Sequence, residues 1–131
     1  MFVEGFKHSI EWVERADVFL DDAEKHLTGE HFWLTCFESH QVTELYLKSL
    51  LVSITGLHPY THDLTELLDT LAVAGFNMSE DVRISSELLT LHYTLSHYLR
   101  KHAVRYARDR AERCLKSAKV VIEWVMRVAD P

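Results

Sequence analysis

The sequence has few of the residues that interrupt helices. Its 131 residues include four glycines and two prolines, and one of the prolines, Pro131, is the last residue. Only Pro59 can therefore interrupt an element, which favours long helices over many short strands. No apolar run approaches the roughly 18 residues that span a bilayer. We therefore expect no membrane-spanning helix. A Gly-rich phosphate loop is also lacking, so an α/β nucleotide-binding fold is not expected.

Cysteine is equally scarce. Cys36 and Cys114 are too few for a disulfide framework, and neither belongs to a close pair of the kind that binds zinc or does redox work. The N-terminus is acidic and amphipathic, without the basic and apolar regions of a signal peptide. We therefore expect a protein of the reducing cytoplasm.

Apolar residues recur at steps of three and four, which is the pattern of amphipathic helices. Helices are expected over about 4–27, ended by Gly29, and over about 30–55, ended by Gly56; the second is apolar on more than one face and should be central. Pairs of capping residues, Asp63 with Glu66 and Asn77 with Glu80, then open two further helices. The first of these ends near residue 74, and the second carries the stripe Ile84, Leu88, Leu91 and Leu95.

The last expected helix runs from about 107 to about 126, and no glycine or proline marks where the preceding helix stops between residues 99 and 106. No repeat or linker divides the chain. Long helices joined by short loops pack as antiparallel neighbours. The sequence therefore predicts a single domain over residues 1–131, an all-α, up-and-down antiparallel bundle of four to five helices.

Charge is distributed unevenly along the chain. Residues 1–99 hold sixteen acids and five Lys or Arg, whereas residues 100–131 hold four acids and nine Lys or Arg. A helical-wheel projection of the last helix places four charged residues on the side away from the core: Glu112, Lys116, Lys119 and Glu123. They form an ordinary solvent-exposed face of mixed charge. Two interpretations remain for the basic residues at the start of the last helix and just before it. They form a site for an anion, or they pair with carboxylates of the acidic half of the chain or of a second subunit. These cations are Arg100, Lys101, His102, Arg105 and Arg108.

Polar residues also interrupt the apolar second helix. Gln41, Glu44 and Lys48 are spaced by three and then four, so they share one face, and Glu44 and Lys48 are in the favourable order for an ion pair. They form either a structural salt bridge at the edge of the bundle or a polar strip that lines a groove or a subunit interface.

Nine histidines raise the question of a metal site. His58 and His62 are four apart, but Pro59 between them places them in a loop rather than on one helical face. No repeated Glu-x-x-His motif supplies further ligands, and no Gly-x-Ser-x-Gly nucleophile elbow is present. We expect no metal, no cofactor and no catalytic residue of these classes.

Three motifs together resemble the HEPN (higher eukaryotes and prokaryotes nucleotide-binding) domain family. The first is an aromatic residue followed by Gln-x-x-Glu-x-x-x-Lys, matched by Phe37, Gln41, Glu44 and Lys48. The second is a His-Asp-Leu start to the third helix, matched by His62, Asp63 and Leu64. The third is a Tyr followed by Arg-Tyr before the last helix, matched by Tyr98, Arg105 and Tyr106.

The resemblance implies a bundle of four to five helices that forms a homodimer or larger homo-oligomer. Many members resemble the partner of a minimal nucleotidyltransferase, including members of toxin and antitoxin pairs. Other members are metal-independent ribonucleases, whose active site is an Arg followed after four to six residues by a His. No Arg in this chain has a His at that spacing, so the chain resembles the subgroup that carries Arg-Tyr instead.

We therefore expect a nucleotide-associated binding or assembly module, rather than an enzyme, that acts beside a nucleotidyltransferase-like protein. Two alternatives stay open: a divergent ribonuclease that uses His97 or His102 with Arg100, and a purely structural interaction scaffold. As a binding module, the protein would contact a nucleotide or RNA ligand through residues of the basic segment, from Arg100 to Arg108, and of the second helix. These candidates are Arg100, His102, Arg105, Tyr106, Gln41, Glu44 and Lys48.

Overall fold

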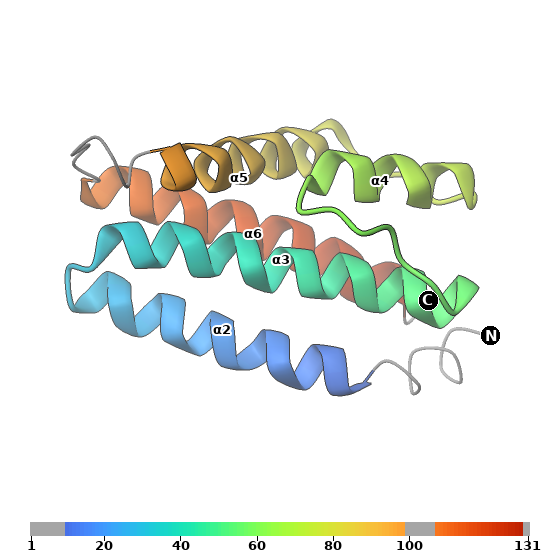
Figure 1. Cartoon of the computed structure of the whole chain (residues 1–131), viewed down its shortest axis with the longest axis horizontal. Coiled ribbons are helices and arrows are strands. Elements are labelled where there is room, and N and C mark those ends of the chain that lie inside the picture. The colour runs from blue at the N-terminus through green and yellow to red at the C-terminus, as the bar shows by residue number, and fades with distance from the viewer. Residues whose placement is uncertain (1–9, 99–106, 130–131) are drawn as a thin grey trace.

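The described part of the chain is an all-α bundle, as the periodicity predicts. A computed structural model describes residues 10–98 and 107–129, which form five helices and no strand (Figure 1). The helices are α2 (Ile10–Thr28), α3 (Phe32–Thr55), α4 (Leu64–Val73), α5 (Glu80–Tyr98) and α6 (Arg108–Ala129). Within these ranges no helix is both long and apolar enough to cross a membrane. Expected helix residues 4–9 and the joint at residues 99–106 lie outside the described residues.

Helix α3 lies at the centre of the bundle. It packs against each of the other four helices, with α2 along one side and α5 and α6 along the other (Figure 1). Its leucines Leu47, Leu50 and Leu51 are almost completely buried, and so are polar side chains on other faces of the same helix. The expectation that the second helix of the sequence is central is therefore confirmed.

The helix ends lie at or close to the glycine and capping residues that predict them. α2 ends at Thr28, beside Gly29, but the left-handed backbone conformation, with φ of 62°, falls on Glu30. α3 ends as expected at Gly56, whose φ of 78° is a conformation that glycine adopts without steric cost. The expected helix start at Asp63 is also confirmed, because Oδ1 of Asp63 accepts from the backbone N–H of Thr65 at 2.9 Å.

The other capping prediction, at Asn77, is wrong. α5 begins at Glu80, and the carbonyl of Ser79 accepts from the backbone N–H of Arg83, so Ser79 holds the cap position. Asn77 instead accepts a hydrogen bond on its carbonyl from Nε1 of Trp124 in α6, at 3.0 Å. Asn77 therefore joins the turn before α5 to the last helix rather than capping α5.

The α5 helix is present, but it buries a different face from the one its apolar stripe suggests. Ile84 and Leu91 are 52% and 57% exposed, and Leu88 is half-buried. The face turned inward carries Val82, Ser85, Ser86, Leu89 and His92. Small serine side chains let helices approach closely, and a hydrophobicity count scores them as surface residues, so periodicity alone selects the wrong stripe.

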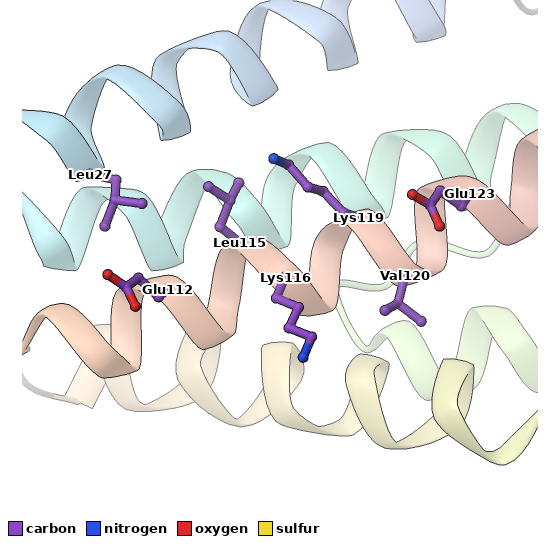
Figure 2. A pocket seen from close by; sticks show the side chains of 7 residues that line it. All are labelled: Leu27, Glu112, Leu115, Lys116, Lys119, Val120 and Glu123. Carbon is purple, nitrogen blue, oxygen red and sulfur yellow. The ribbon is translucent and has the colours of Figure 1, made fainter.

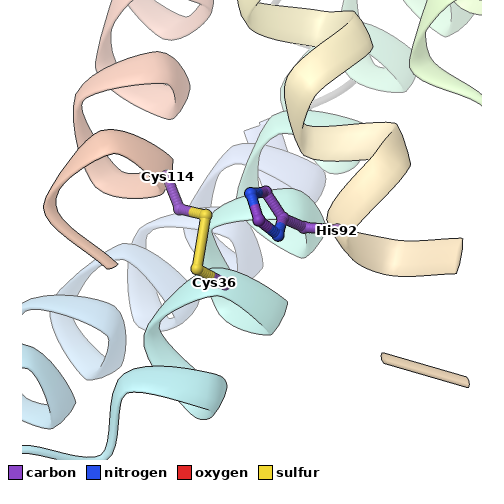
Figure 3. Close-up of side chains that lie close together, drawn as sticks. All are labelled: Cys36, His92 and Cys114. Atoms are coloured by element: carbon purple, nitrogen blue, oxygen red, sulfur yellow. A yellow bond between two sulfur atoms is a disulfide. The ribbon is translucent and has the colours of Figure 1, made fainter. Parts of the chain in front are cut away.

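A disulfide bond between Cys36 and Cys114 joins α3 to α6 (Figure 3). Their Cα atoms are 5.1 Å apart, a separation usual for this crosslink. The spacing of the two cysteines did not predict it, because they are 78 residues apart and meet only through tertiary packing. Both are almost completely buried in the core.

We predict that reduction of this disulfide destabilises the protein. Closing a loop of this length restricts the unfolded chain, which corresponds to a stabilisation of about 4.5 kcal/mol in the chain-entropy account. Urea unfolding with and without a phosphine reductant, with a chelator throughout, measures the difference. The double variant Cys36→Ser/Cys114→Ser should show no response to the reductant, and equal stability of oxidised and reduced wild-type protein would contradict the prediction.

Candidate functional site

A buried carboxylate links a buried ammonium to an exposed imidazole. Oε2 of Glu44 accepts from Nζ of Lys48 at 3.2 Å, and Oε1 of Glu44 accepts from Nδ1 of His62 at 2.8 Å. The side chains of Glu44 and Lys48 are 7% and 8% exposed, whereas that of His62 is 54% exposed. The expected ion pair is therefore present, but it lies inside the bundle rather than at its edge. A carboxylate in such a place needs several partners to offset its lost hydration.

The loop before α4 is held to α3 at His62 by two separate contacts. Besides the contact of its ring with Glu44, the backbone carbonyl of His62 accepts from Nε2 of His40 at 2.8 Å. Since His40 and Glu44 are one helical turn apart on α3, they hold the backbone and the ring of His62 in register. His58, although four residues from His62, packs edge-on against Trp12 instead, with ring centroids 5.0 Å apart.

His40 is a fully buried, neutral histidine. Burial lowers the pKa of its ring to about 4, and the charges of Lys48 and His62 act in the same direction, against that of Glu44. Nε2 carries the proton that is donated to the carbonyl, so Nδ1 is an acceptor, and it has no hydrogen-bond partner among the described residues. His40, Glu44, Lys48 and His62 are called the polar cluster below.

A row of stacked rings ends at the polar cluster. Trp33 stacks on Phe37 with centroids 5.7 Å apart, and Phe37 stacks on Tyr93 of α5 at 6.4 Å. Tyr93 in turn lies 5.1 Å from the ring of His62. The aromatic row Trp33, Phe37, Tyr93 and His62 thus begins and ends at an exposed ring. Burial and the nearby Glu44 carboxylate raise the pKa of the Tyr93 hydroxyl, which keeps it a neutral donor.

The structure brings together some of the sequence-predicted residues. Glu44 and Lys48 are in contact, and Gln41, half-buried, lies one turn before them on α3. The side chains of Arg100, His102, Arg105 and Tyr106, like those of His97 and Tyr98, fall outside the described part, so their approach to α3 stays a prediction. The sequence motifs did not single out His40, Trp33 or Tyr93, whereas Phe37 and His62 were marked by their places in the first and second family motifs.

Arg108 is the one cation of the basic segment in the described part of the chain, and its charge is paired with a carboxylate of the same chain. Arg108 lies 3.2 Å from the carboxylate of Glu30 and 5.1 Å from the ring centroid of Phe32. The loop between α2 and α3 thus meets the first turn of α6. For Arg108, the charge-match interpretation fits better than that of a free anion site.

A shallow pocket of about 500 Å³ lies between α2 and α6 (Figure 2). Its lining residues are Leu27, Glu112, Leu115, Lys116, Lys119, Val120 and Glu123. Lys119 reaches toward α2, where it pairs with Glu24 at 3.1 Å, rather than with Glu123. The expected exposure of the charged residues of this face is confirmed. Because both signs alternate along it, the pocket favours no charged ligand.

The family assignment agrees with this geometry. A model of the HEPN domain matches residues 10–128, so the chain belongs to the HEPN domain family. The match includes the polar cluster, the aromatic row and both cysteines. No curated protein matches the sequence.

Solved structures share the fold over almost the whole chain. The protein TT1696 from Thermus thermophilus is 25% identical, with a TM-score of 0.82 over 91% of this chain and 96% of that one. ST0689, described as an archaeal HEPN homologue, is 24% identical, with a TM-score of 0.74 over 93% and 98%. A HEPN domain protein from Thermotoga maritima, tm0613, is 18% identical, with a TM-score of 0.72 over 90% and 96%.

We predict that His40 makes the stability of the protein depend on pH. Its pKa is about 4 in the folded protein and near its usual value when unfolded, so the unfolded state takes up a proton first as the pH falls. This should cost the folded state about 2 kcal/mol between about pH 7 and about pH 5. Urea unfolding at both pH values should show a smaller loss for His40→Gln than for the wild type.

The matched control is His31→Gln, which replaces an exposed histidine and should keep the wild-type dependence. His92, whose pKa is lowered by burial and by Arg110 and Arg113, acts in the same direction in all three proteins and cancels from the comparison. An unchanged pH dependence in His40→Gln would show that His40 is not the group responsible.

Proposed function

We propose that this HEPN domain is a nucleotide-associated binding and assembly module, a single domain over the whole chain that acts as a homodimer in the cytoplasm. It binds a nucleotide or an unpaired RNA base at the aromatic row and works beside a minimal nucleotidyltransferase-like protein, as in a toxin and antitoxin pair. The observation that carries the proposal is the aromatic row, which ends at an exposed His62 held by a buried Glu44 and Lys48 pair.

The row offers the kind of surface on which a base stacks. A base has a π-face whatever its identity, and stacking on an aromatic side chain contributes about 1–3 kcal/mol per base. Trp33 and His62 are the exposed members, and the rings between them, Phe37 and Tyr93, are half-buried and fixed by packing. A preformed ring costs little entropy to order when a ligand binds.

His62 adds a polar group at the same place. Its Nδ1 is directed to Glu44, so Nε2 is the ring nitrogen that remains for a ligand. A carboxylate behind an imidazole fixes the tautomer and the orientation of the ring. Phosphate contacts in the proposal come from Arg100, His102, Arg105 and Tyr106, which precede α6 in the sequence; of these, Arg105 and Tyr106 belong to the third family motif. Glu44 and Lys48 position His62 rather than contact the ligand, since both are buried.

The exposed stripe of α5 supports the homodimer. HEPN domains commonly oligomerise, and this stripe presents the exposed Ile84 and Leu91 on one face of one helix, with the half-buried Leu88 between them. Two copies related by a two-fold axis bury the same stripe against itself, so one apolar helix face is sufficient for an isologous interface. The stripe lies on the helix that also carries Tyr93, so dimerisation would hold α5, and with it the aromatic row, in place.

Trp33→Ala is predicted to weaken nucleotide binding by about tenfold, because it removes one stacking surface. His62→Ala should weaken it as well. Isothermal titration with a panel of nucleotides and short single-stranded RNA measures both. Tyr60→Ala, which removes a fully exposed ring outside the row, serves as the matched control and should leave the affinity unchanged.

Absence of binding by the wild-type protein would remove the ligand from the proposal and favour the structural scaffold. Cleavage of labelled RNA in the presence of a chelator, lost in His102→Ala, would favour the ribonuclease alternative instead.

The double variant Ile84→Glu/Leu91→Glu is predicted to be monomeric, because two charges would be buried at the proposed interface without partners. Light scattering after size exclusion measures the mass. Val73→Glu changes an apolar residue of α4 that is 90% exposed and should leave the dimer intact. A monomeric wild-type protein, or a dimeric double variant, would show that α5 is not the interface.

A further inference from the structure

Three side chains that bind soft metal ions converge in the core, and none of them belongs to the polar cluster. Cys36 comes from α3, His92 from α5 and Cys114 from α6, and their ligand atoms all lie within 4.8 Å of one another (Figure 3). Each residue is at most 8% exposed. Figure 3 shows the ring of His92 beside the sulfur atoms of the two cysteines. In the oxidised protein these sulfurs are bonded to each other.

We propose that the reduced protein binds one thiophilic metal ion, of the Zn²⁺ or Cu⁺ class, through Cys36, His92 and Cys114. Two thiolates and one imidazole are the donor set that such ions prefer over carboxylate and carbonyl oxygens. Two thiolates also balance the charge of Zn²⁺ in a place from which water is excluded. The role goes beyond the proposed function, because none of the three residues belongs to the aromatic row or to the polar cluster.

The third donor distinguishes this site from a simple crosslink. A disulfide requires only the two sulfurs, whereas here a nitrogen from a third helix lies within reach of both. All three ligands stand on helices of the bundle, so their positions are set by packing before the ion arrives. Bringing the ligands together therefore costs little, which is the condition for tight binding by a small number of ligands.

The crosslinked and metal-bound forms exclude each other. Two equivalents of a thiol reductant convert the disulfide into two cysteine thiols and one oxidised reductant disulfide, a two-electron step. Binding of the ion then displaces one proton from each thiol. Oxidation by a disulfide of the same class removes both electrons, reforms the crosslink and releases the ion. The redox state of the two cysteines thus decides which of two links joins α3 to α6.

The ion would also affect α5. The crosslink connects only α3 and α6, whereas the ion adds His92 and therefore joins three helices. His92 immediately precedes Tyr93, the α5 member of the aromatic row. Loading with metal would fix this turn of α5, and its effect on stability can be measured without any assay of ligand binding.

Metal loading of the full-length protein tests the proposal. The chain is reduced with a phosphine, loaded separately with Zn²⁺, Cu⁺ or Co²⁺ without oxygen, and desalted before metal is counted by elemental analysis. We expect one retained ion per reduced chain and none per oxidised chain, together with a higher Tm. Co²⁺ should give thiolate charge-transfer absorption, which reports the sulfur ligands in the wild-type protein itself. The Zn²⁺ and Cu⁺ arms decide which ion is retained more tightly.

Variants then assign the ligands. Cys114→Ser should abolish retention and the charge-transfer band, and His92→Gln should weaken binding more than about tenfold, the range seen when metal ligands lose even their supporting contacts. His31→Gln is the control for loss of a histidine, and circular dichroism checks that each variant is folded. Less than stoichiometric metal in the reduced wild type, or undiminished binding by Cys114→Ser or His92→Gln, overturns the proposal.

Discussion

The buried carboxylate of Glu44 is the constraint on which the candidate site depends. An ionised carboxyl group without water is tolerated only when cations and hydrogen-bond donors surround it. Lys48 supplies the charge from the same helix, but the second oxygen needs a donor from elsewhere, and His62 provides it. Satisfying Glu44 therefore determines where the loop before α4 must pass. It also explains how an exposed imidazole comes to be rigidly placed at the end of a row of rings.

Helix α3 carries residues of both the polar cluster and the cysteine and histidine group. Glu44 and His40 face the loop and α5, while Cys36, nearer the start of the helix, faces α6. α5 takes part in both, because His92 and Tyr93 are neighbours in the chain, one near the sulfurs and the other in the aromatic row. Any shift of α5 along α3 would thus be felt at both places. Such sharing is a consequence of close packing, in which helices move as units rather than residue by residue.

Local patterns predicted what local physics determines. Helix positions, the stop at Gly56 and the cap at Asp63 follow from periodicity and from backbone hydrogen bonding within a few residues. The pairing of Glu44 with Lys48 was visible for the same reason. The contact of His62 with Tyr93, the meeting of Cys36 with Cys114 and the inward face of α5 depend on which helices become neighbours. Amphipathicity shows that α5 has two faces, but only its partners decide that the one with the serines is buried.

The disulfide also changes how the chain responds to mechanical force. Residues 36–114 form a covalently closed ring that holds α4, α5 and most of α3, and α2 and most of α6 extend from it as two tails. A force applied at the two ends of the oxidised chain runs through the bond between the sulfurs and bypasses the ring. It can extend the tails, but it cannot stretch the segment that carries His62 and Tyr93. In the oxidised form, the helices that hold the candidate site are therefore shielded from tension on the termini.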